Sequence, residues 1–443
     1  MKKGDFQVGD LAVYIGVDSV VNTTDSRFGF LRSKLTKHTE ADLSRIRPKK
    51  FEGEWTRGVV GSMDWLKEAD DILGFASYNE GDDVSALLGV TSYVHSNETN
   101  IATVEKVGNL IPIPGKDKIE LAVVNGWNCI VEKGQFQVGQ LAVYLAIGCV
   151  PDLDDPNFAF LQQKGLDRIK TMRLGGVVSQ GLLCPLQWLT DRGVTDVHTL
   201  QAGDNVAALM GATKYIPPEE AAQYDTRSNK ANDPYPSYVP KTDALRLQTD
   251  PERLLRDIAD KDIVITRKED GCSATYLFNQ DKFSICGRNY VWRKVDKNSQ
   301  SYFTMAAQLG LETKMRALGR SLAIQGELCG NNINHNRHKI TQLKYSVFDV
   351  FDIDQQQYLS YDDMCAVCTT LGLTTVPLLY RGPATEAVPS LTVDAFLKMA
   401  ESLEYGPGLP AEGIVINSDP IGYLGRRTHF KLISNKYLLK YDL

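Results

Sequence analysis

The stretch from Ile263 to Leu277, IVITRKEDGCSATYL, constrains this chain more than any other. An apolar run leads into Lys268–Gly271, and alternating residues follow from Ser273. This pattern predicts a strand, a tight turn that carries a lysine, and a second strand. A lysine becomes a nucleophile when a metal, neighbouring cations or loss of water lowers its pKa. Gly271 lets backbone approach a ligand closely. A charged hairpin is the alternative, and K-x-D-G alone is too short to decide.

Five segments downstream complete an ordered pattern. They are SICGRN (284–289), QGELCG (325–330), YSVFD (345–349), AEGIVI (411–416) and FKLISNKY (430–437). Together with the lysine turn, they resemble motifs I, Ia, III, IIIa, IV and V of the covalent nucleotidyltransferases. That superfamily includes ATP-dependent DNA and RNA ligases and mRNA capping enzymes. Six ordered elements within about 170 residues are hard to explain by chance.

The resemblance implies a ligation in three steps. A lysine attacks the α-phosphate of ATP, releases pyrophosphate and retains AMP. The adenylate then passes to a 5′-phosphate end of RNA, and a 3′-hydroxyl attacks the activated phosphate and releases AMP. Each step displaces a group at an anionic phosphorus atom, so positive charge, metal ions and positioning matter more than acid–base chemistry.

The same resemblance assigns catalytic and metal-binding residues. Lys268 is the expected nucleophile, and Lys431 is expected to hold the α-phosphate through the transition state. Asp270, Glu327 and Glu412 are expected to gather Mg²⁺ or Mn²⁺, directly or through water, because hard cations take oxygen ligands. A surface carboxylate is an unlikely alternative for Glu327, because an idle charge in its apolar surroundings would be costly.

Further residues are expected to contact the nucleotide. Phe348 would stack on adenine, with core packing as its alternative and as the preferred interpretation of Phe351. Arg288 would contact ribose or the RNA end, or else be an exposed strand arginine. Arg246, which follows Lys241-Thr242-Asp243, would help to orient the triphosphate. Lys436 is a weaker candidate, because motif V is often K-x-K and residue 433 here is Ile.

A segment after motif III departs from the family pattern. Ile333–Lys339 resembles the RNA ligases' I-Q-x-N-x-Y-x-L, but it keeps the asparagine and lacks the glutamine and the tyrosine. A role in recognising the RNA end is therefore in doubt. Its two histidines lie three residues apart without a third ligand nearby, so we predict no zinc site.

The N-terminal half contains an internal repeat. Lys3–Ile15 matches Lys133–Leu145 at an offset of 130 residues, and shorter matches follow. Two copies of one unit account for this. The second copy is preceded by Ala102–Lys133, whose alternating runs predict about five short strands that close into a small barrel. It resembles the N-terminal OB-fold domain of one branch of the RNA ligases. The first copy lacks a counterpart of this segment and would leave an open edge.

These observations give the expected domain organisation. We predict an α+β protein with a partial OB-like repeat at residues 1–95 and an OB-fold domain at residues 101–216. A Pro-rich linker would span residues 217–240. A nucleotidyltransferase domain of antiparallel sheets and helices would span residues 241–443.

OB barrels commonly bind single-stranded nucleic acid through aromatic side chains and basic grooves. For each candidate here, a buried aromatic residue or a solvated face is the preferred alternative. The candidates are Trp127, Phe136, Lys164, Arg168, Lys170 and Arg173, and in the first copy Arg45, Arg47, Lys49 and Lys50.

Composition limits the partners and the compartment. The net charge is −6, so any RNA contact must use local basic patches. No apolar run approaches the roughly 20 residues that span a bilayer, and the N-terminus lacks the core of a signal peptide. Eight cysteines without a framework spacing predict reduced thiols in a cytoplasmic protein. Cys365 and Cys368 form a lone C-x-x-C, for which a metal site is not expected.

The position of the OB domain separates the relatives. DNA ligases and capping enzymes resemble one another in carrying an OB domain after motif V, whereas here the OB-like unit precedes Lys268. We therefore expect an ATP-dependent RNA ligase that acts in RNA repair on 5′-phosphate and 3′-hydroxyl ends, nicked duplex among them. The alternatives are a nick-sealing DNA ligase, a capping-like guanylyltransferase and a non-catalytic OB-containing RNA-binding protein. The full set of expected catalytic residues argues against the last.

Overall fold

The computed structural model describes most of the chain from residue 100 onward and parts of the chain before it. The described residues are 6–7, 9–16, 19–22, 25–28, 43–45, 49–51, 54–56, 58–66, 84, 88, 90–92, 100–216, 233–236, 238–294, 299–355, 357–419 and 427–443. The chain divides into two compact units, Met1–Glu98 and Thr99–Leu443. Each unit is described by itself.

The first unit consists of short antiparallel strands. β1 (Val13–Gly16) pairs with β6 (Gly58–Gly61), and β2 (Ser19–Asn22) lies between β3 (Leu43–Arg45) and β7 (Thr91–Ser92). β4 (Lys49–Phe51) pairs with β5 (Glu54–Thr56). A small apolar core is formed by Val13, Ile15, Val21, Phe28, Leu66 and Leu88. The side chains of the basic run predicted at residues 45–50 lie outside the described part of the structure.

The second unit begins with the OB fold that the sequence predicts. Its main sheet has the order β10 (Trp127–Glu132), β9 (Ile119–Val124), β8 (Ala102–Pro112), β11 (Leu141–Leu145), β15 (Leu182–Pro185). β8 pairs with both β9 and β11, and its register with β9 shifts between Val107 and Asn109. A bulge of this kind bends a strand, which allows one long strand to serve two parts of a curled sheet.

The two aromatic candidates for contacting nucleic acid in this domain are core residues. Trp127 and Phe136 are 6% and 2% exposed and pack against β8, β9 and β11. The buried alternative is therefore the correct one for both. The smaller elements of the domain are β12 (Cys149–Val150), α2 (Ala159–Gln163), β13 (Thr171–Leu174), β14 (Val177–Gln180), α3 (Gln187–Asp191) and β16 (Thr213–Lys214).

Residues 217–232 of the predicted linker lie outside the described part of the chain. The end of the linker is packed rather than loose. β17 (Asp233–Pro234) pairs with β22 (Tyr290–Val291), and Tyr235 is 9% exposed against the larger sheet of the following domain.

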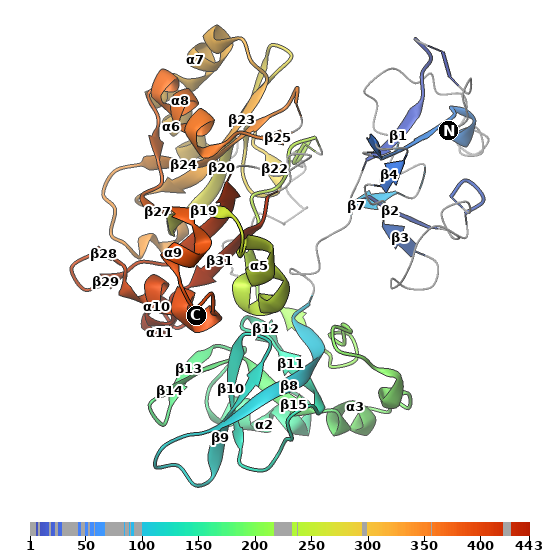
Figure 1. The fold of residues 1–443 in the computed structure, drawn as a ribbon, viewed down its shortest axis with the longest axis vertical. Coiled ribbons are helices and arrows are strands. Elements are labelled where there is room, and N and C mark those ends of the chain that lie inside the picture. Colours follow the sequence, from blue (N-terminus) through green and yellow to red (C-terminus); the bar gives the residue numbers. More distant parts are fainter. Residues whose placement is uncertain are drawn as a thin grey trace. The chain divides into compact units, whose positions relative to one another are not determined.

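The remainder of the unit contains two sheets (Figure 1). The larger sheet has the order β17, β22, β21 (Lys282–Cys286), β20 (Cys272–Asn279), β23 (Leu322–Cys329), β24 (Lys344–Asp352), β25 (Gln357–Tyr358), and β26 (Thr374–Thr375) also pairs with β24. The smaller has the order β18 (Leu245–Arg246), β31 (His429–Ile433), β30 (Gly413–Asp419), β19 (Asp262–Lys268), β27 (Leu378–Pro383). β28 (Glu404–Gly406) pairs with β29 (Leu409–Pro410).

Helices cover the two sheets. α6 (Gln300–Leu309), α7 (Leu311–Leu318) and α8 (Tyr361–Leu371) share a core with β20, β23 and β24 (Figure 1). α5 (Pro251–Ile258), α9 (Ala384–Ala387) and α10 (Val393–Ser402) pack on the smaller sheet. α11 (Asn435–Lys440) follows β31. This mixture of β-rich modules and helices is the α+β class that the sequence predicts.

The two strands that flank the lysine turn exist as predicted, but they do not form a hairpin. β19 belongs to the smaller sheet and β20 to the larger one. The turn Glu269–Gly271 therefore carries the chain from one sheet to the other. Lys268, the last residue of β19, stands at the junction of the two sheets.

None of the helices in the described part of the chain has the length and apolar character needed to cross a membrane. All eight cysteines are free thiols. Burial raises the pKa of Cys129 to about 12 and that of Cys368 likewise to about 12, as expected for reduced core thiols.

Candidate active site

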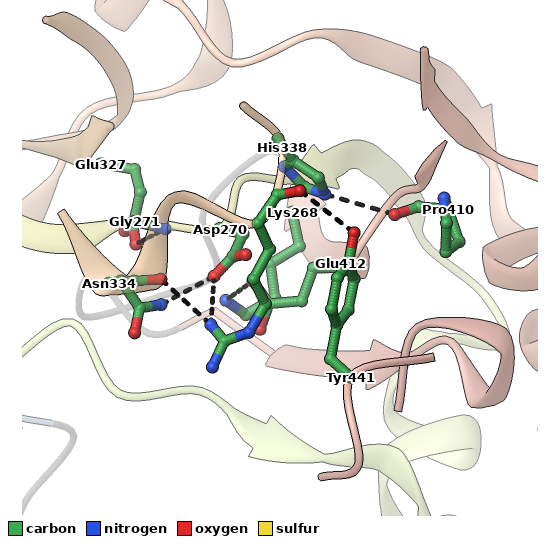
Figure 2. A network of polar contacts seen from close by, with 10 residues as sticks. Lys268, Asp270, Gly271, Glu327, Asn334, His338, Pro410, Glu412 and Tyr441 are labelled. Carbon is green, nitrogen blue, oxygen red and sulfur yellow. Dashed lines mark hydrogen bonds and ion pairs between the residues drawn. The ribbon is translucent and has the colours of Figure 1, made fainter. Parts of the chain in front are cut away.

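Lys268 is paired with a carboxylate from the neighbouring strand. β30 runs antiparallel to β19 with Gly413 opposite Lys268, so Glu412 ends beside the lysine. The Nζ atom of Lys268 donates to Oε2 of Glu412 at 2.7 Å (Figure 2). Burial disfavours the ammonium ion, but the charges of Glu412 and Glu327 outweigh burial and raise the pKa of Lys268. This raised pKa favours the ammonium form of Lys268, so a role as nucleophile would require a group that accepts its proton.

The turn after Lys268 is packed too closely for a side chain at residue 271. The Gly271 amide donates to Oε1 of Glu327 at 3.1 Å. A Cβ atom at Gly271 would lie 2.3 Å from the carbonyl oxygen of Leu328. The sequence predicts that glycine allows a close approach here, and the group that approaches is the backbone of β23. Gly271 thereby brings Glu327 to the lysine turn.

Asp270 is the middle residue of this turn, and its side chain is buried. Its Oδ1 accepts from Nδ2 of Asn334 at 2.7 Å and from the guanidinium of Arg337 at 3.3 Å (Figure 2). Its Oδ2 is buried without a hydrogen bond of ordinary geometry to any described residue. Burial, and secondarily the charge of Glu412, raises the pKa of Asp270 against a smaller opposing effect of Tyr437.

Sequence reasoning missed both residues that hold Asp270. The family pattern draws attention to Asn336, yet Asn336 closes its own turn through two hydrogen bonds of 2.8 Å with Ile340. Asn334, which stands where the family has glutamine, makes the contact to Asp270. The available signal was the run NNINHN, because asparagine tolerates left-handed backbone. Residues 332, 334, 335 and 336 all have positive φ.

The three carboxylates predicted to bind metal all surround Lys268. Burial raises the pKa of Glu327 to about 8, opposed by the charge of Lys268. Ionising the buried carboxyl groups of Asp270 and Glu327 is costly. A hard divalent cation favours the ionised form of a carboxyl group, so these two groups suit such a cation. In the described residues, however, no three acidic, histidine or cysteine side chains come close enough together to hold an ion. The joint ligand set stays a prediction.

The predicted phosphate-binding residues meet at the edge of the smaller sheet. β18 runs parallel to β31, and Arg246 lies opposite Lys431 in the register. Burial, together with the charges of Lys268 and Arg246, lowers the pKa of Lys431 to about 8. The Arg246 guanidinium lies 5.6 Å from the ring centre of Trp127, so the OB domain reaches this edge of the site.

A cavity of about 980 Å³ is lined by Lys268, Glu327, Arg288, Phe348 and Lys431, whereas Arg246, Asp270 and Glu412 lie outside its lining. That volume is at the upper end of the range typical of small-molecule sites. Arg288 forms an ion pair with Asp243 at 2.9 Å, which brings motif Ia to the segment that opens the domain.

Phe348 of motif IIIa and the nearby Phe351 differ in their surroundings. Phe348 is half-buried and faces the cavity. Phe351 is 4% exposed and packs edge-to-face on Tyr358, so the core interpretation of Phe351 is confirmed. The nucleotide contact of Phe348 stays a prediction with suitable geometry.

Lys436 is the predicted residue that the structure separates from the others. It is exposed in the first turn of α11, whereas Glu412 and Arg246, which also lie outside the cavity lining, contact Lys268 and lie beside Lys431. The next residue, Tyr437, is 2% exposed and approaches Asp270 closely enough to affect its pKa. In α11 the buried Tyr437, rather than Lys436, therefore faces Asp270.

The chain matches two family models. Residues 261–433 match a model of RNA ligase, and residues 1–63 and 101–186 match a model of an OB-fold domain. The OB-fold match therefore includes part of each repeat copy. A search of curated proteins finds no match.

Solved structures of an RNA ligase from Naegleria gruberi are similar to this one. A mutant form with AMP and Mn is 28% identical and covers 77% of this chain and 99% of that chain, with a TM-score of 0.65. The ligase with PPi gives the same identity, the same coverage and the same TM-score. A mutant form with ATP and Mn is 27% identical, with coverage of 77% and 99% and a TM-score of 0.64.

Proposed function

This chain is an ATP-dependent RNA ligase with an N-terminal OB-fold domain, and from that premise we propose that it joins 5′-phosphate and 3′-hydroxyl ends of RNA through AMP bound covalently to Lys268. The observation that carries the proposal is the place of Lys268. It lines the large cavity, contacts the carboxylate of Glu412 and shares the cavity with Phe348 and Lys431.

ATP is the nucleotide that this cavity is proposed to bind. The similar ligase structures contain ATP, AMP or PPi. Phe348 offers a half-buried aromatic face for adenine. Lys431 and Arg246 offer positive charge for the phosphates. Arg288 is poised to exchange its pairing with Asp243 for a ribose or RNA contact.

The first step uses the contact between Lys268 and Glu412. Lys268 gives one proton to Glu412, and the freed electron pair of Nζ forms a bond to the α-phosphorus of ATP. The bond from that phosphorus to pyrophosphate breaks, and pyrophosphate leaves with the bonding electrons. The second proton of Nζ, made acidic by the new bond to phosphorus, passes to the departing pyrophosphate, which leaves a neutral nitrogen bound to AMP. Lys431 and Arg246 stabilise the negative charge that develops on the phosphate oxygens.

Asp270, Glu327 and Glu412 are the chain's own candidates for holding a divalent ion. Bound Mg²⁺ or Mn²⁺ would screen phosphate charge at this site. The raised pKa values of the buried Asp270 and Glu327 suit such a ligand role, because a divalent ion favours the ionised carboxylate.

In the second step, a 5′-phosphate oxygen of RNA attacks the adenylate phosphorus, and the bond to Lys268 breaks as its nitrogen takes back a proton from Glu412 and leaves as an amine. A 3′-hydroxyl then attacks the 5′-phosphorus, loses its proton to solvent, forms the phosphodiester bond and releases AMP with the electrons of the broken bond. We propose RNA repair, including the sealing of nicked duplex, as the role. We propose the cytoplasm as the place, because all eight cysteines are free thiols.

The first test is labelling of the protein. The purified chain is incubated with α-³²P-labelled ATP or GTP and Mg²⁺ or Mn²⁺, and then run on a denaturing gel. We expect label from ATP on the protein, and none on the Lys268→Ala variant. Lys282→Ala is the matched control, because Lys282 is an exposed lysine on β21. Label from GTP alone would favour a capping-like guanylyltransferase, and no label with either metal would overturn the proposal.

The second test is sealing. A 5′-phosphorylated nicked RNA duplex, and the same nick in DNA, are incubated with labelled wild-type protein and unlabelled competitor ATP. Joined RNA is the expected product. Joining of the DNA nick at a higher rate than the RNA nick would replace RNA repair by DNA nick sealing.

A further inference from the structure

The last ten residues connect the OB fold to the acidic side of the active site. We name residues Ser434–Leu443, which include α11, the C-terminal strap. One face of the strap contacts strands β13 and β14 of the OB fold. The other face contacts Asp270, Arg337 and Glu412.

On the OB side the strap is fixed by buried polar contacts. The Gln180 side-chain amide donates to Oδ1 of Asn435 at 2.8 Å, and these residues are 2% and 6% exposed. The Thr171 amide donates to the carbonyl oxygen of Leu443 at 3.0 Å. Removing one partner of a buried hydrogen bond leaves the other unsatisfied, which costs more than the bond itself contributes.

Gln180 is itself held in place by the OB core. Its carbonyl oxygen accepts from the buried hydroxyl of Tyr144 at 2.9 Å. A more exposed ion pair between Lys170 and Asp442, 2.6 Å apart, supports the same junction. Lys170 was a candidate RNA contact with a solvated face as the preferred alternative, and in the structure its ammonium group pairs with Asp442 of the strap.

On the site side the strap contacts the residues that hold the carboxylates. The Tyr441 hydroxyl donates to the carbonyl oxygen of Arg337 at 3.1 Å (Figure 2). Arg337 in turn donates to Asp270. The Ser434 amide donates to the carbonyl oxygen of Glu412 at 2.8 Å. The rings of Tyr437 and Tyr441 lie 4.9 Å apart and fill the space between these contacts.

We propose that the C-terminal strap is a positioning device, through which docking of the OB fold at Asn435 sets the geometry of Asp270 beside the nucleophile. Asn435 and Gln180 touch no reacting group, so they are positioning residues. The inference deepens the proposed function and rests on it. It assigns to the OB fold a part in the first chemical step, separate from any binding of RNA.

The test is a double-mutant cycle on the full chain with Gln180→Ala, Asn435→Ala and the combination. Single-turnover labelling by ATP gives kcat and KM, and the half-maximal Mn²⁺ concentration is measured for each variant. Hydrogen exchange at the Gly271 amide, followed without nucleotide or metal, reports on the turn independently of activity. Gln187→Ala is the matched control, because the exposed Gln187 side chain donates to exposed Asp191 within α3 of the OB fold.

We expect each single variant to reduce kcat at least about fivefold, which corresponds to about 1 kcal/mol of lost transition-state stabilisation. KM for ATP should change less than about twofold, because the strap contacts no predicted nucleotide-binding residue except Glu412 through its backbone. The Gly271 amide should exchange faster, and the double variant should be no worse than either single variant.

The inference would be overturned by variants that keep the wild-type kcat and the wild-type Gly271 exchange. If their melting temperatures fall at the same time, the contact between Gln180 and Asn435 is a merely structural junction. Tyr441→Phe, which removes only the hydroxyl, gives a second route to the same readouts if an alanine variant fails to fold. Failure of the wild-type chain to label would instead be a failure of the proposed function.

Discussion

Lys268 is the last residue of β19 and Glu412 immediately precedes the antiparallel strand β30 of the same sheet, and their side chains form an ion pair with a distance of 2.7 Å from Nζ to Oε2. The pairing places the proposed nucleophile beside a carboxylate that can take its proton. It also makes the protonation of Lys268 depend on a residue 144 positions away in the sequence.

Replacing Glu412 should make Lys268 reactive at lower pH. Glu412→Gln removes a carboxylate that raises the pKa of Lys268, and an opposite charge at such distances typically shifts a pKa by about 1–3 units. Modification of Lys268 by an amine-specific reagent, followed by mass spectrometry across a pH series, should show a profile moved to lower pH by about one unit or more. An unchanged profile would mean that Glu412 does not control this lysine. ATP labelling should fall in the same variant.

Glu327→Gln should stabilise the free protein while abolishing labelling. In the folded state the pKa of Glu327 is raised to about 8, whereas in the unfolded state it is about 4.5. Between these pH values Glu327 is neutral in the folded protein and ionised in the unfolded chain. Stability from this group is present below pH 4.5 and is lost as the pH rises to 8. The variant should gain about 2–4 kcal/mol in the free energy of unfolding at pH 8 and almost nothing at pH 4.5. Denaturant titrations at the two pH values measure this, and an equal gain at both would contradict it.

Phe348 and Phe351 should separate nucleotide binding from stability. Phe348→Ala removes a half-buried ring that faces the cavity, so KM for ATP should rise roughly tenfold, since each 1.4 kcal/mol of lost binding is a factor of ten. Phe351→Ala removes a core ring and should cost about 3–5 kcal/mol of stability. Its KM for ATP should change little. The reverse pattern in labelling kinetics and thermal unfolding would exchange the two roles.

Gly271→Ala should disrupt the lysine turn. The added Cβ would lie 2.3 Å from a backbone oxygen that cannot rotate away. We expect a loss of about 2–4 kcal/mol in the free energy of unfolding and no detectable labelling. Gly108→Ala is the control, since its Cβ would lie 3.4 Å from the nearest heavy atom. Equal stability of the two variants would show that the turn accommodates a side chain.

Labelling should depend on a divalent ion held by Asp270. EDTA should stop it, and added Mn²⁺ or Mg²⁺ should restore it. Asp270→Asn should raise the half-maximal Mn²⁺ concentration at least about tenfold, because the variant replaces a charged hard ligand by a neutral one. Calorimetric titration of Mn²⁺ into the nucleotide-free protein gives a readout separate from activity. Wild-type Mn²⁺ affinity in the variant would remove Asp270 from the ligand set.

Much of this site could be predicted from local sequence because each motif is a short strand or turn with its functional residue at a fixed place. Lys268 and Lys431 line one cavity, and Arg246 lies opposite Lys431 in the strand register; their roles stay predictions. That β19 and β20 belong to different sheets could not be predicted, because the partner of a strand is not contained in the strand. The sequence likewise left two positions open for Trp127, because an aromatic side chain in an alternating run fits either face of a barrel. The preferred interpretation, a core residue, is the one that the structure shows.

The contacts missed by sequence reasoning are those made across long separations. Asn334 and Arg337 reach Asp270 from a segment that departs from the family pattern, and the backbone geometry of that segment decides which asparagine faces the site. Lys436 was chosen by its spacing, but the helix that starts at Asn435 turns Tyr437 inward instead.

The glycines around the nucleophile limit how this site can be engineered. Side chains at Gly271, Gly326 and Gly413 would meet backbone oxygens at 2.3, 2.6 and 2.0 Å. A directed-evolution library that randomises these positions would consist mostly of misfolded members. Phe348 and Arg288 are better positions for substitutions that aim at a new specificity for the nucleotide or the RNA end. Their side chains line the cavity, and replacing them would leave the junction of the two sheets intact.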